Sequence, residues 1–322
     1  MNPIFADVLW LHVPDGFLSP GIAIFCWALA LLAVGLAVRN ARETFDERLV
    51  PLAGVMAAFI FAGQMINFPV AGGTSGHLVG ASLAAIVLGP WLGILVMTAV
   101  IILQALLFQD GGLVVMGANI LVMGVTPALI SYGLFRSAAK RSRRMQLVTV
   151  AGAAWLSVMG AALLTALLLG FSGTSSFRIA VPALLGVHAL IGIGEALITV
   201  AALSFIMNAR PQLLQTSVEA GGRGWIVGGI VITLLVILVS PFASGFPDGL
   251  EWVAEENGFL HTAVNAPFQI LPDYTIPTLG DSGLSTVLAG VVGALLVAGI
   301  TFGLARMLRG KKPGTNGLET GD

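Results

Sequence analysis

The sequence predicts an all-α polytopic membrane protein, a helical bundle of about nine transmembrane helices arranged as seven plus two. Of its 322 residues, 57% are hydrophobic and only 10% are charged. A soluble core of this size does not need so much apolar surface. Apolar runs long enough to span a bilayer recur along the chain, with basic residues between alternate runs. We therefore expect a multi-pass protein of the plasma (inner) membrane, surrounded by lipid.

The apolar runs place the spans in order along the chain. Residues 78–108 could form one long span or two, because Gly89-Pro90 in their middle signals a break, whereas proline kinks also occur in membrane helices. With a hairpin there, the expected spans are residues 20–38, 50–67, 78–88, 91–108, 117–135, 147–170, 181–207, 224–240 and 284–308.

The distribution of basic residues favours the hairpin. With nine spans, 14 of the 15 Lys and Arg residues lie on one side and only Arg178 lies opposite. A single fused span would move the cluster from Arg136 to Arg144 across the membrane, against the positive-inside rule. The N-terminus is then outside and the C-terminus cytoplasmic. His12, the loop that contains His77 and residues 241–283 all face outward.

The third expected span is short, which bears on His77. Residues 78–88 supply about 16 Å of helix, little more than half of a hydrocarbon core of about 30 Å. The glycine-rich loop before them must then enter the membrane, where irregular backbone persists only when protein buries it. We expect Thr74 or Ser75 to cap the helix. We expect His77 to lie inside a protein cavity.

Several chemistries are absent from the sequence. The single cysteine, Cys26, excludes a disulfide framework and a thiolate metal site. No G-x-x-x-x-G-K-[ST] motif is present, so the chain does not hydrolyse nucleotide through a P-loop. No His-Glu-x-x-His motif supports a membrane metalloprotease. The net charge of −1 gives no indication of a nucleic-acid partner.

Histidines are the candidate ligands. Two outward-facing imidazoles, His12 and His77, favour borderline cations such as Ni²⁺, Co²⁺, Zn²⁺ or Cu²⁺ over Mg²⁺ or Ca²⁺. A second pair, His188 and Glu195, lies seven residues apart on one face of the seventh span. Ionisable groups at that depth are candidates for function, but a hydrogen-bonded pair that staples the bundle is an equal alternative.

Residues 224–322 differ in character and are expected to form a separate two-helix module. Their outer loop, residues 241–283, has six acidic residues and neither Lys nor Arg, and includes the run Pro-Asp-Gly-Leu-Glu at positions 247–251. The loop is too long for a simple connector. It is either a solvated spacer or a means of concentrating cations at the outer mouth. His261 lies within it, and we exclude His261 from the site.

Five motifs occur together along the chain: His12 to Pro20, Gly73-Thr74-Ser75-Gly76-His77, Leu88-Gly89-Pro90-Trp91, Phe108-Gln109-Asp110-Gly111-Gly112, and Pro247 to Glu251. Together they resemble the CbiM/NikM family, the substrate-capture components of energy-coupling-factor transporters for cobalt and nickel. The resemblance covers residues 11–210, and residues 224–322 are similar to the small CbiN/NikN component, here fused.

This resemblance implies a ligand set. In the family the mature chain starts Met-His, and the metal is bound by the terminal amine, the next amide and imidazole, and the imidazole of the Gly-Gly-Thr-Ser-x-His loop. Leu11, His12 and His77 match these positions. Four nitrogens in a plane suit Ni²⁺ and can suit Co²⁺, whereas Zn²⁺ prefers a tetrahedron. Ten residues precede Leu11 here and carry no secretory signal, so we expect residues 1–10 to be a non-native or processed extension.

The resemblance also implies a function. The chain would capture Co²⁺ or Ni²⁺ outside the cell, for cobalamin biosynthesis or nickel enzymes, as a non-enzymatic transporter component without a prosthetic group. Its partners would be a transmembrane coupling subunit and cytoplasmic ATPase subunits. A self-sufficient secondary transporter is the alternative, which predicts repeated halves with broken helices. The sequence does not separate cobalt from nickel.

Overall fold

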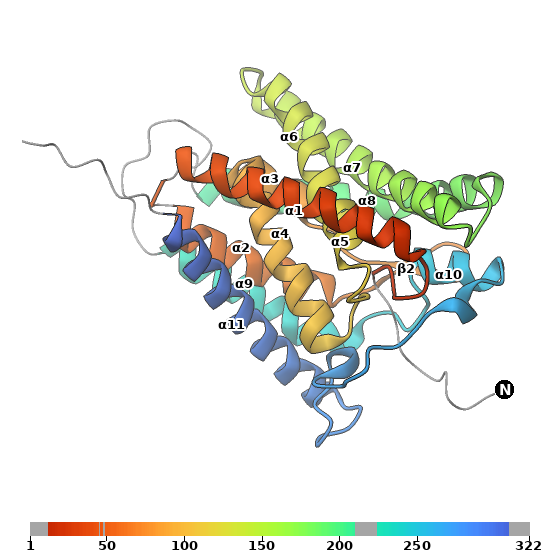
Figure 1. Cartoon of the computed structure of the whole chain (residues 1–322). Coiled ribbons are helices and arrows are strands. Elements are labelled where there is room, and N and C mark those ends of the chain that lie inside the picture. Colours follow the sequence, from red (N-terminus) through yellow and green to blue (C-terminus); the bar gives the residue numbers. More distant parts are fainter. Residues whose placement is uncertain (1–11, 45, 48, 210–223, 309–322) are drawn as a thin grey trace, which may run out of the picture.

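A computed structural model describes residues 12–44, 46–47, 49–209 and 224–308 of the chain (Figure 1). It is mainly helical. The elements are α1 (Pro20–Glu43), α2 (Leu49–Gln64), β1 (Phe68–Val70), β2 (Thr74–Gly76), α3 (Ala81–Leu88), α4 (Pro90–Leu103), η1 (Gln104–Phe108), α5 (Met116–Asn119), η2 (Ile120–Val125), α6 (Thr126–Ala138), α7 (Arg143–Ser172), α8 (Phe177–Ala209), α9 (Gly224–Val239), η4 (Ser240–Phe242), α10 (Gly249–Glu256), η5 (Leu260–Thr262), η6 (Pro272–Tyr274) and α11 (Gly283–Met307).

Six helical segments in the described part of the chain are long and apolar enough to cross a membrane. They are Pro20–Glu43, Pro90–Phe108, Met116–Ala138, Arg143–Ser172, Phe177–Asn208 and Gly283–Met307. Two shorter apolar helices, Leu49–Gln64 and Ile226–Phe242, accompany them. Each lies within a few residues of an expected span, which is the behaviour of a multi-pass membrane protein.

The chain reverses at Gly89, so residues 78–108 form two segments rather than one. Gly89 has φ of +81° and separates α3 from α4. A Cβ placed on Gly93 would lie 2.9 Å from the backbone of Ala85, although eight residues of one continuous helix would separate them by about 12 Å. The expected hairpin at Gly89-Pro90 is therefore confirmed.

The loop before α3 is more regular than expected. Residues 68–76 form a two-stranded antiparallel hairpin in which Phe68 pairs with Gly76 and Val70 with Thr74. Gly72 and Gly73, both at positive φ, form its turn. Pairing of the two strands satisfies backbone groups that an irregular loop would leave unbonded. The all-α expectation therefore misses one short hairpin.

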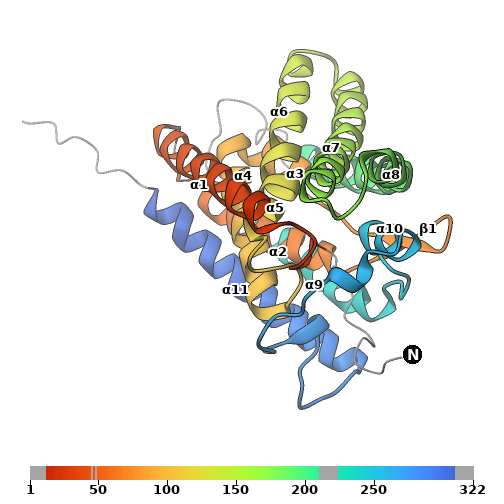
Figure 2. The ribbon, with the colours of Figure 1, turned by 45° about the vertical axis from the view of Figure 1, so that its right-hand side comes forward.

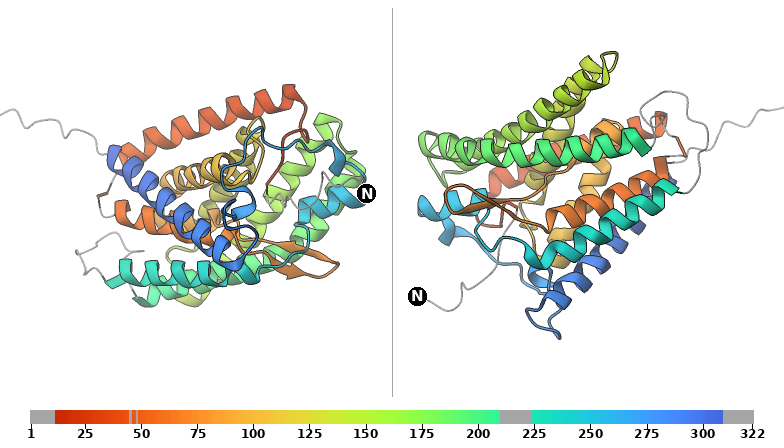
Figure 3. Two further views of the ribbon diagram at one scale, coloured as in Figure 1. Left: turned by 90° about the horizontal axis from the view of Figure 1, so that it is seen from below. Right: turned by 180° about the vertical axis from the view of Figure 1, so that it is seen from behind.

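The helices form two groups with α3 and α4 between them (Figure 2). In one group α6, α7 and α8 pack side by side, and in the other α2 lies between α9 and α11. The C-terminal module is therefore packed onto the rest of the bundle, as the view from behind also shows (Figure 3).

The two ends of the bundle differ in charge. The C-terminal ends of α1 and α11, which carry Arg42 and Arg306, lie together at the left in Figure 1. The β-hairpin and the acidic helix α10 lie at the opposite end. The first of these ends matches the basic side expected from the sequence.

Candidate metal centre

His12 lies in the segment before α1 and is almost completely buried, with 2% of its surface exposed. Its Nδ1 atom is 2.9 Å from Oδ1 of Asp110 and 3.0 Å from the carbonyl oxygen of the same residue. Its Nε2 atom is buried without a hydrogen-bond partner. A carboxylate that orients one ring nitrogen while the other stays open is the usual arrangement around a metal-binding histidine.

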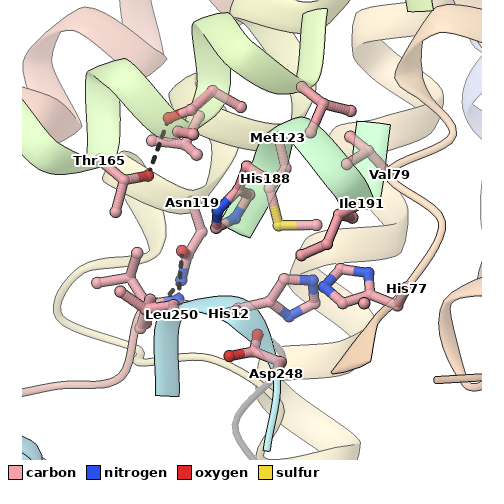
Figure 4. Close-up of a pocket in the computed structure, with 17 residues that line it drawn as sticks. His12, His77, Val79, Asn119, Met123, Thr165, His188, Ile191, Asp248 and Leu250 are labelled. Atoms are coloured by element: carbon pink, nitrogen blue, oxygen red, sulfur yellow. Dashed lines mark hydrogen bonds between the residues drawn. The ribbon is translucent and has the colours of Figure 1, made fainter. Parts of the chain in front are cut away.

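His77, directly after β2, lies beside His12, as the family resemblance implies (Figure 4). The two ring centroids are 5.7 Å apart and the ring planes are nearly perpendicular, at 81°. His77 is 9% exposed, and its Nδ1 atom lies 3.0 Å from the carbonyl oxygen of Leu78. The expectation that His77 is enclosed by protein is confirmed.

The segment that carries His12 is hydrogen-bonded to the loop after η1 and to α5, which follows that loop. The amide side chain of Asn119 accepts from the Val13 N–H and donates to the Val13 carbonyl, both at 3.0 Å. The carboxylate of Asp15 accepts from three consecutive N–H groups, those of residues 113–115. Gly111, at φ of +99°, leaves room for His12, because a Cβ there would be 2.9 Å from the His12 Cβ.

Both imidazoles line a cavity of about 60 Å³. Its other polar walls are Asn119, Thr165, His188 and Asp248 (Figure 4). Among the described residues, no group of three or more His, Cys, Asp or Glu side chains is close enough to share one ion. Two imidazoles would therefore need donors of another kind, such as backbone nitrogen or water.

The C-terminal module covers this cavity. Ser75 donates its N–H to the Pro247 carbonyl at 2.8 Å and its hydroxyl to the Phe246 carbonyl at 2.8 Å. Thr74 also donates to the Pro247 carbonyl, at 3.1 Å. The expectation that Thr74 or Ser75 caps α3 is therefore wrong, because both hydroxyls bind the Pro-Asp-Gly-Leu-Glu loop. That contact places Asp248, which caps α10 by accepting from the Glu251 N–H at 2.7 Å, in the cavity wall.

A second contact from the module reaches His12 indirectly. Tyr274 donates its hydroxyl to Oδ2 of Asp110 at 2.5 Å, while the Gln104 amide donates to the same hydroxyl at 3.0 Å. The ring of Tyr274 stacks on Phe108 with centroids 4.7 Å apart. Tyr274, Asp110 and His12 thus form a continuous chain from the module to the candidate ligand.

Burial and neighbouring charge set the protonation of this cluster. Burial alone lowers the pKa of His12, but the charge and hydrogen bonds of Asp110 outweigh it and raise that pKa above 6.5. Burial raises the pKa of Asp248 to about 7, and the nearby Asp110 charge adds to the increase. A dication entering the cavity would therefore compete with protons near neutral pH.

Of the other candidate residues, His188 lines the cavity, whereas Glu195 and His261 do not. His188 lines the cavity and donates from Nδ1 to the Leu184 carbonyl at 2.8 Å. Glu195 instead accepts from the N–H groups of Val79 and Gly80. The alternative in which these two side chains bond to each other is therefore wrong. His261 lies in η5, away from the cavity wall.

Sequence reasoning assigned no role to Asp110, Asp248 or Tyr274. Asp110 and Asp248 lie in the motifs Gln-Asp-Gly-Gly and Pro-Asp-Gly-Leu-Glu. These motifs mark both positions but do not indicate which residues the two carboxylates contact. Nothing near Tyr274 in the sequence indicates its role. Leu11, the third expected metal residue, lies outside the described residues.

Fold and site together define a multi-pass membrane protein with a buried pair of imidazoles at one end of its bundle. The chain belongs to the CbiM family, described as the cobalt uptake substrate-specific transmembrane region, which matches residues 12–213. A PDGLE domain matches residues 223–310. The protein therefore fuses a CbiM unit to a PDGLE unit.

Individual relatives agree with this architecture. A provisionally named fused nickel transport protein, NikMN, of Archaeoglobus fulgidus is 33% identical over 93% of this chain and 99% of its own length. The cobalt transport protein CbiM of Sorangium cellulosum is 33% identical over 63% of this chain and 94% of its own. The crystal structure of a truncated transition metal transporter is 31% identical, with a TM-score of 0.55 over 62% of this chain and 99% of that one.

Proposed function

We propose that this protein captures Co²⁺ or Ni²⁺ outside the cell and serves as the metal-binding component of an energy-coupling-factor importer. The observation that carries the proposal is the buried, unpartnered Nε2 atom of His12 beside the imidazole of His77. Imidazole ligands suit both ions, and the relatives above are named as nickel or cobalt transport proteins. The metal is cargo, so the site has to release it as well as bind it.

The ligand set that we propose is His12, His77 and a nitrogen at position 11. An amine at position 11, the His12 amide and the His12 side chain can close fused chelate rings only through Nδ1. Here Nδ1 contacts Asp110 and Nε2 is open. The chelate therefore requires the His12 ring to turn, whereas coordination through Nε2 keeps Asp110 as the group that orients it.

The proposal for position 11 has a direct test. Intact-mass measurement of the native, metal-binding protein should show a chain that starts at residue 11. Placing residues 1–10 back in front of it should remove most of the affinity for Ni²⁺. A fully active protein that retains those residues would contradict an amine ligand and would favour coordination through Nε2.

The functional division within the chain follows the same proposal. Residues 11–210 form the metal-capture unit and residues 224–322 the two-helix module that covers it. The chain lacks a P-loop, which fits a division of labour in which a transmembrane coupling subunit and cytoplasmic ATPases drive the transport. A self-sufficient secondary transporter is less favoured, because the sequence has no evident internal repeat.

Reconstituted vesicles test the function. We expect uptake of Co²⁺ or Ni²⁺ only when the coupling and ATPase subunits are present with ATP. The matched control is the same vesicle with an ATPase variant that binds ATP but does not hydrolyse it. Uptake that is equally fast without the partners would contradict the proposal and support the secondary-transporter alternative.

A further inference from the structure

Glu195, in the middle of α8, is a fully buried carboxylate with 0% of its surface exposed. It forms no ion pair with any residue in the described part of the chain. A buried carboxylate without a compensating partner is costly, and inside a membrane bundle such groups are rare. Its partners are instead two backbone amides, and the position of those amides suggests why a carboxylate lies there.

The two amides belong to the turn that follows His77. Oε2 of Glu195 accepts from the Val79 N–H at 2.7 Å, and Oε1 accepts from the Gly80 N–H at 3.1 Å. This turn leads into α3, whose N-cap residue, Gly80, has no side chain to cap the helix. A helix N-terminus carries unsatisfied N–H groups and partial positive charge, so the Glu195 carboxylate stabilises this end of α3 by accepting from the N-cap residue and from the residue before it.

The same turn is held from its other side. The Gln64 side chain, in α2, donates to the Val79 carbonyl at 2.9 Å. Gly80 has φ of +79°, and a Cβ there would lie 2.7 Å from a methyl group of Ile60. The backbone of Val79 is therefore held at both its N–H and its C=O, so the two peptide groups on either side of its Cα have little freedom.

The contacts of Glu195 and Gln64 with this turn also restrain the His77 imidazole. One residue separates His77 from Val79, and the Nδ1 atom of His77 lies 3.0 Å from the Leu78 carbonyl in the intervening peptide. On the other side of His77, the strand β2 is paired with β1. Loss of the Glu195 or Gln64 contacts would therefore tilt the His77 ring relative to His12, whose own position is set independently by Asp110.

We propose that Glu195 is a positioning residue for the metal centre. By holding the amides of Val79 and Gly80, it sets the direction in which His77 presents its imidazole to an ion shared with His12. This inference rests on the proposed function, since it concerns how well the same site binds Co²⁺ or Ni²⁺. Partners that orient metal ligands typically contribute 10- to 100-fold in affinity.

The test compares Glu195→Gln with wild type and with Thr199→Val in the full-length protein. Thr199 is a matched control, because it lies one turn further along the same face of α8, is equally buried and has no hydrogen-bond partner for its hydroxyl. Calorimetry gives the Co²⁺ affinity, the visible absorption spectrum of bound Co²⁺ reports ligand geometry, and thermal unfolding reports stability.

We expect Glu195→Gln to lower the Co²⁺ affinity about 10- to 100-fold and to alter the spectrum of the bound ion, while Thr199→Val changes neither. A purely structural role would lower the melting temperature but leave the affinity and spectrum of the folded protein unchanged, and this result would overturn the inference. If Glu195→Gln does not fold, Glu195→Asp replaces it. That variant keeps the charge but shortens the reach, so unchanged affinity and spectrum would again overturn the inference.

Metal binding by the wild-type protein distinguishes a failure of this inference from a failure of the proposed function. Wild-type protein that binds neither Co²⁺ nor Ni²⁺ would contradict the proposed function. Wild-type binding together with an unaffected Glu195→Gln variant would contradict only the positioning role.

Discussion

His12 uses its two ring nitrogens for different tasks. One is held by Asp110, and the other is buried next to His77 without a partner. A buried ring nitrogen without a hydrogen-bond partner costs free energy, about 1 to 3 kcal/mol for a typical polar group. Coordination of a metal ion through Nε2 would remove that cost, which supports the proposed role of His12 as a ligand.

The first prediction concerns His77. We expect His77→Ala to lose more Ni²⁺ affinity than the 10- to 100-fold typical of a group that only orients a ligand. The bundle should stay folded, because the ring faces a cavity rather than a packed core. Calorimetry measures the change, and His261→Ala, outside the cavity wall, is the control. Unchanged affinity in His77→Ala would remove His77 from the site.

The second prediction concerns pH. Imidazole must be neutral to bind metal, and Asp110 raises the pKa of His12, so affinity should begin to fall above pH 6.5 as the solution is acidified. Asp110→Asn removes the opposite charge and should lower the pKa of His12. The midpoint of the affinity loss should then move to lower pH. Measurements of metal affinity between pH 8 and pH 5, in wild type and in Asp110→Asn, test this prediction. A midpoint that does not move would show that Asp110 does not control the pKa of His12.

At the scale of elements, the contact between the β-hairpin and the Pro-Asp-Gly-Leu-Glu loop joins the two units of the chain. It places the Asp248 carboxylate in the cavity wall. Above its pKa of about 7, the ionised Asp248 carboxylate raises the local concentration of cations in the cavity and their association rates. We therefore expect the acidic loop to act on the arriving ion at the site itself, rather than only as a spacer.

A third prediction follows for Asp248. We expect Asp248→Asn to slow the association of Co²⁺ by about tenfold, with a smaller change in dissociation. Stopped-flow mixing at low ionic strength, at a pH above the Asp248 pKa of about 7, measures both rates. Glu256→Gln is the matched control, because Glu256 is an exposed acid on the same helix, α10. Equal slowing in both variants would indicate a general charge effect and would contradict a specific role for Asp248.

The helices of this protein are predictable, and most of its site contacts are not. Apolar runs and the glycine at position 89 locate α1, α4 and the hairpin between α3 and α4, because these depend on local composition. His12 and His77 are identified as a pair only through motifs. The contact of Asp110 with His12 spans 98 residues and that of Glu195 with Val79 spans 116. The position of Asp248 in the cavity wall depends on contacts between its loop and Thr74 and Ser75, more than 170 residues earlier in the chain. No local pattern reports such a contact.

At the scale of the whole molecule, the basic and acidic ends of the bundle predict its orientation. We expect the loop after α6 to be cytoplasmic and the acidic loop after α9 to be outside. Ala139→Cys and Asn265→Cys place exposed thiols on these two loops, and the native Cys26 is buried. A membrane-impermeant maleimide should label Asn265→Cys in intact cells and Ala139→Cys only after permeabilisation. The reverse pattern would contradict the proposed topology.

The central claim is that His12 and His77 hold the transported ion together. X-ray absorption at the metal edge of the Ni²⁺- or Co²⁺-loaded protein tests it most directly, because imidazole rings give characteristic outer-shell scattering. We expect a first shell of nitrogen or oxygen without sulfur, with scattering from two imidazoles in wild type and from one in His77→Ala. A sulfur ligand in wild type, or an imidazole signal that His77→Ala leaves unchanged, would contradict the claim.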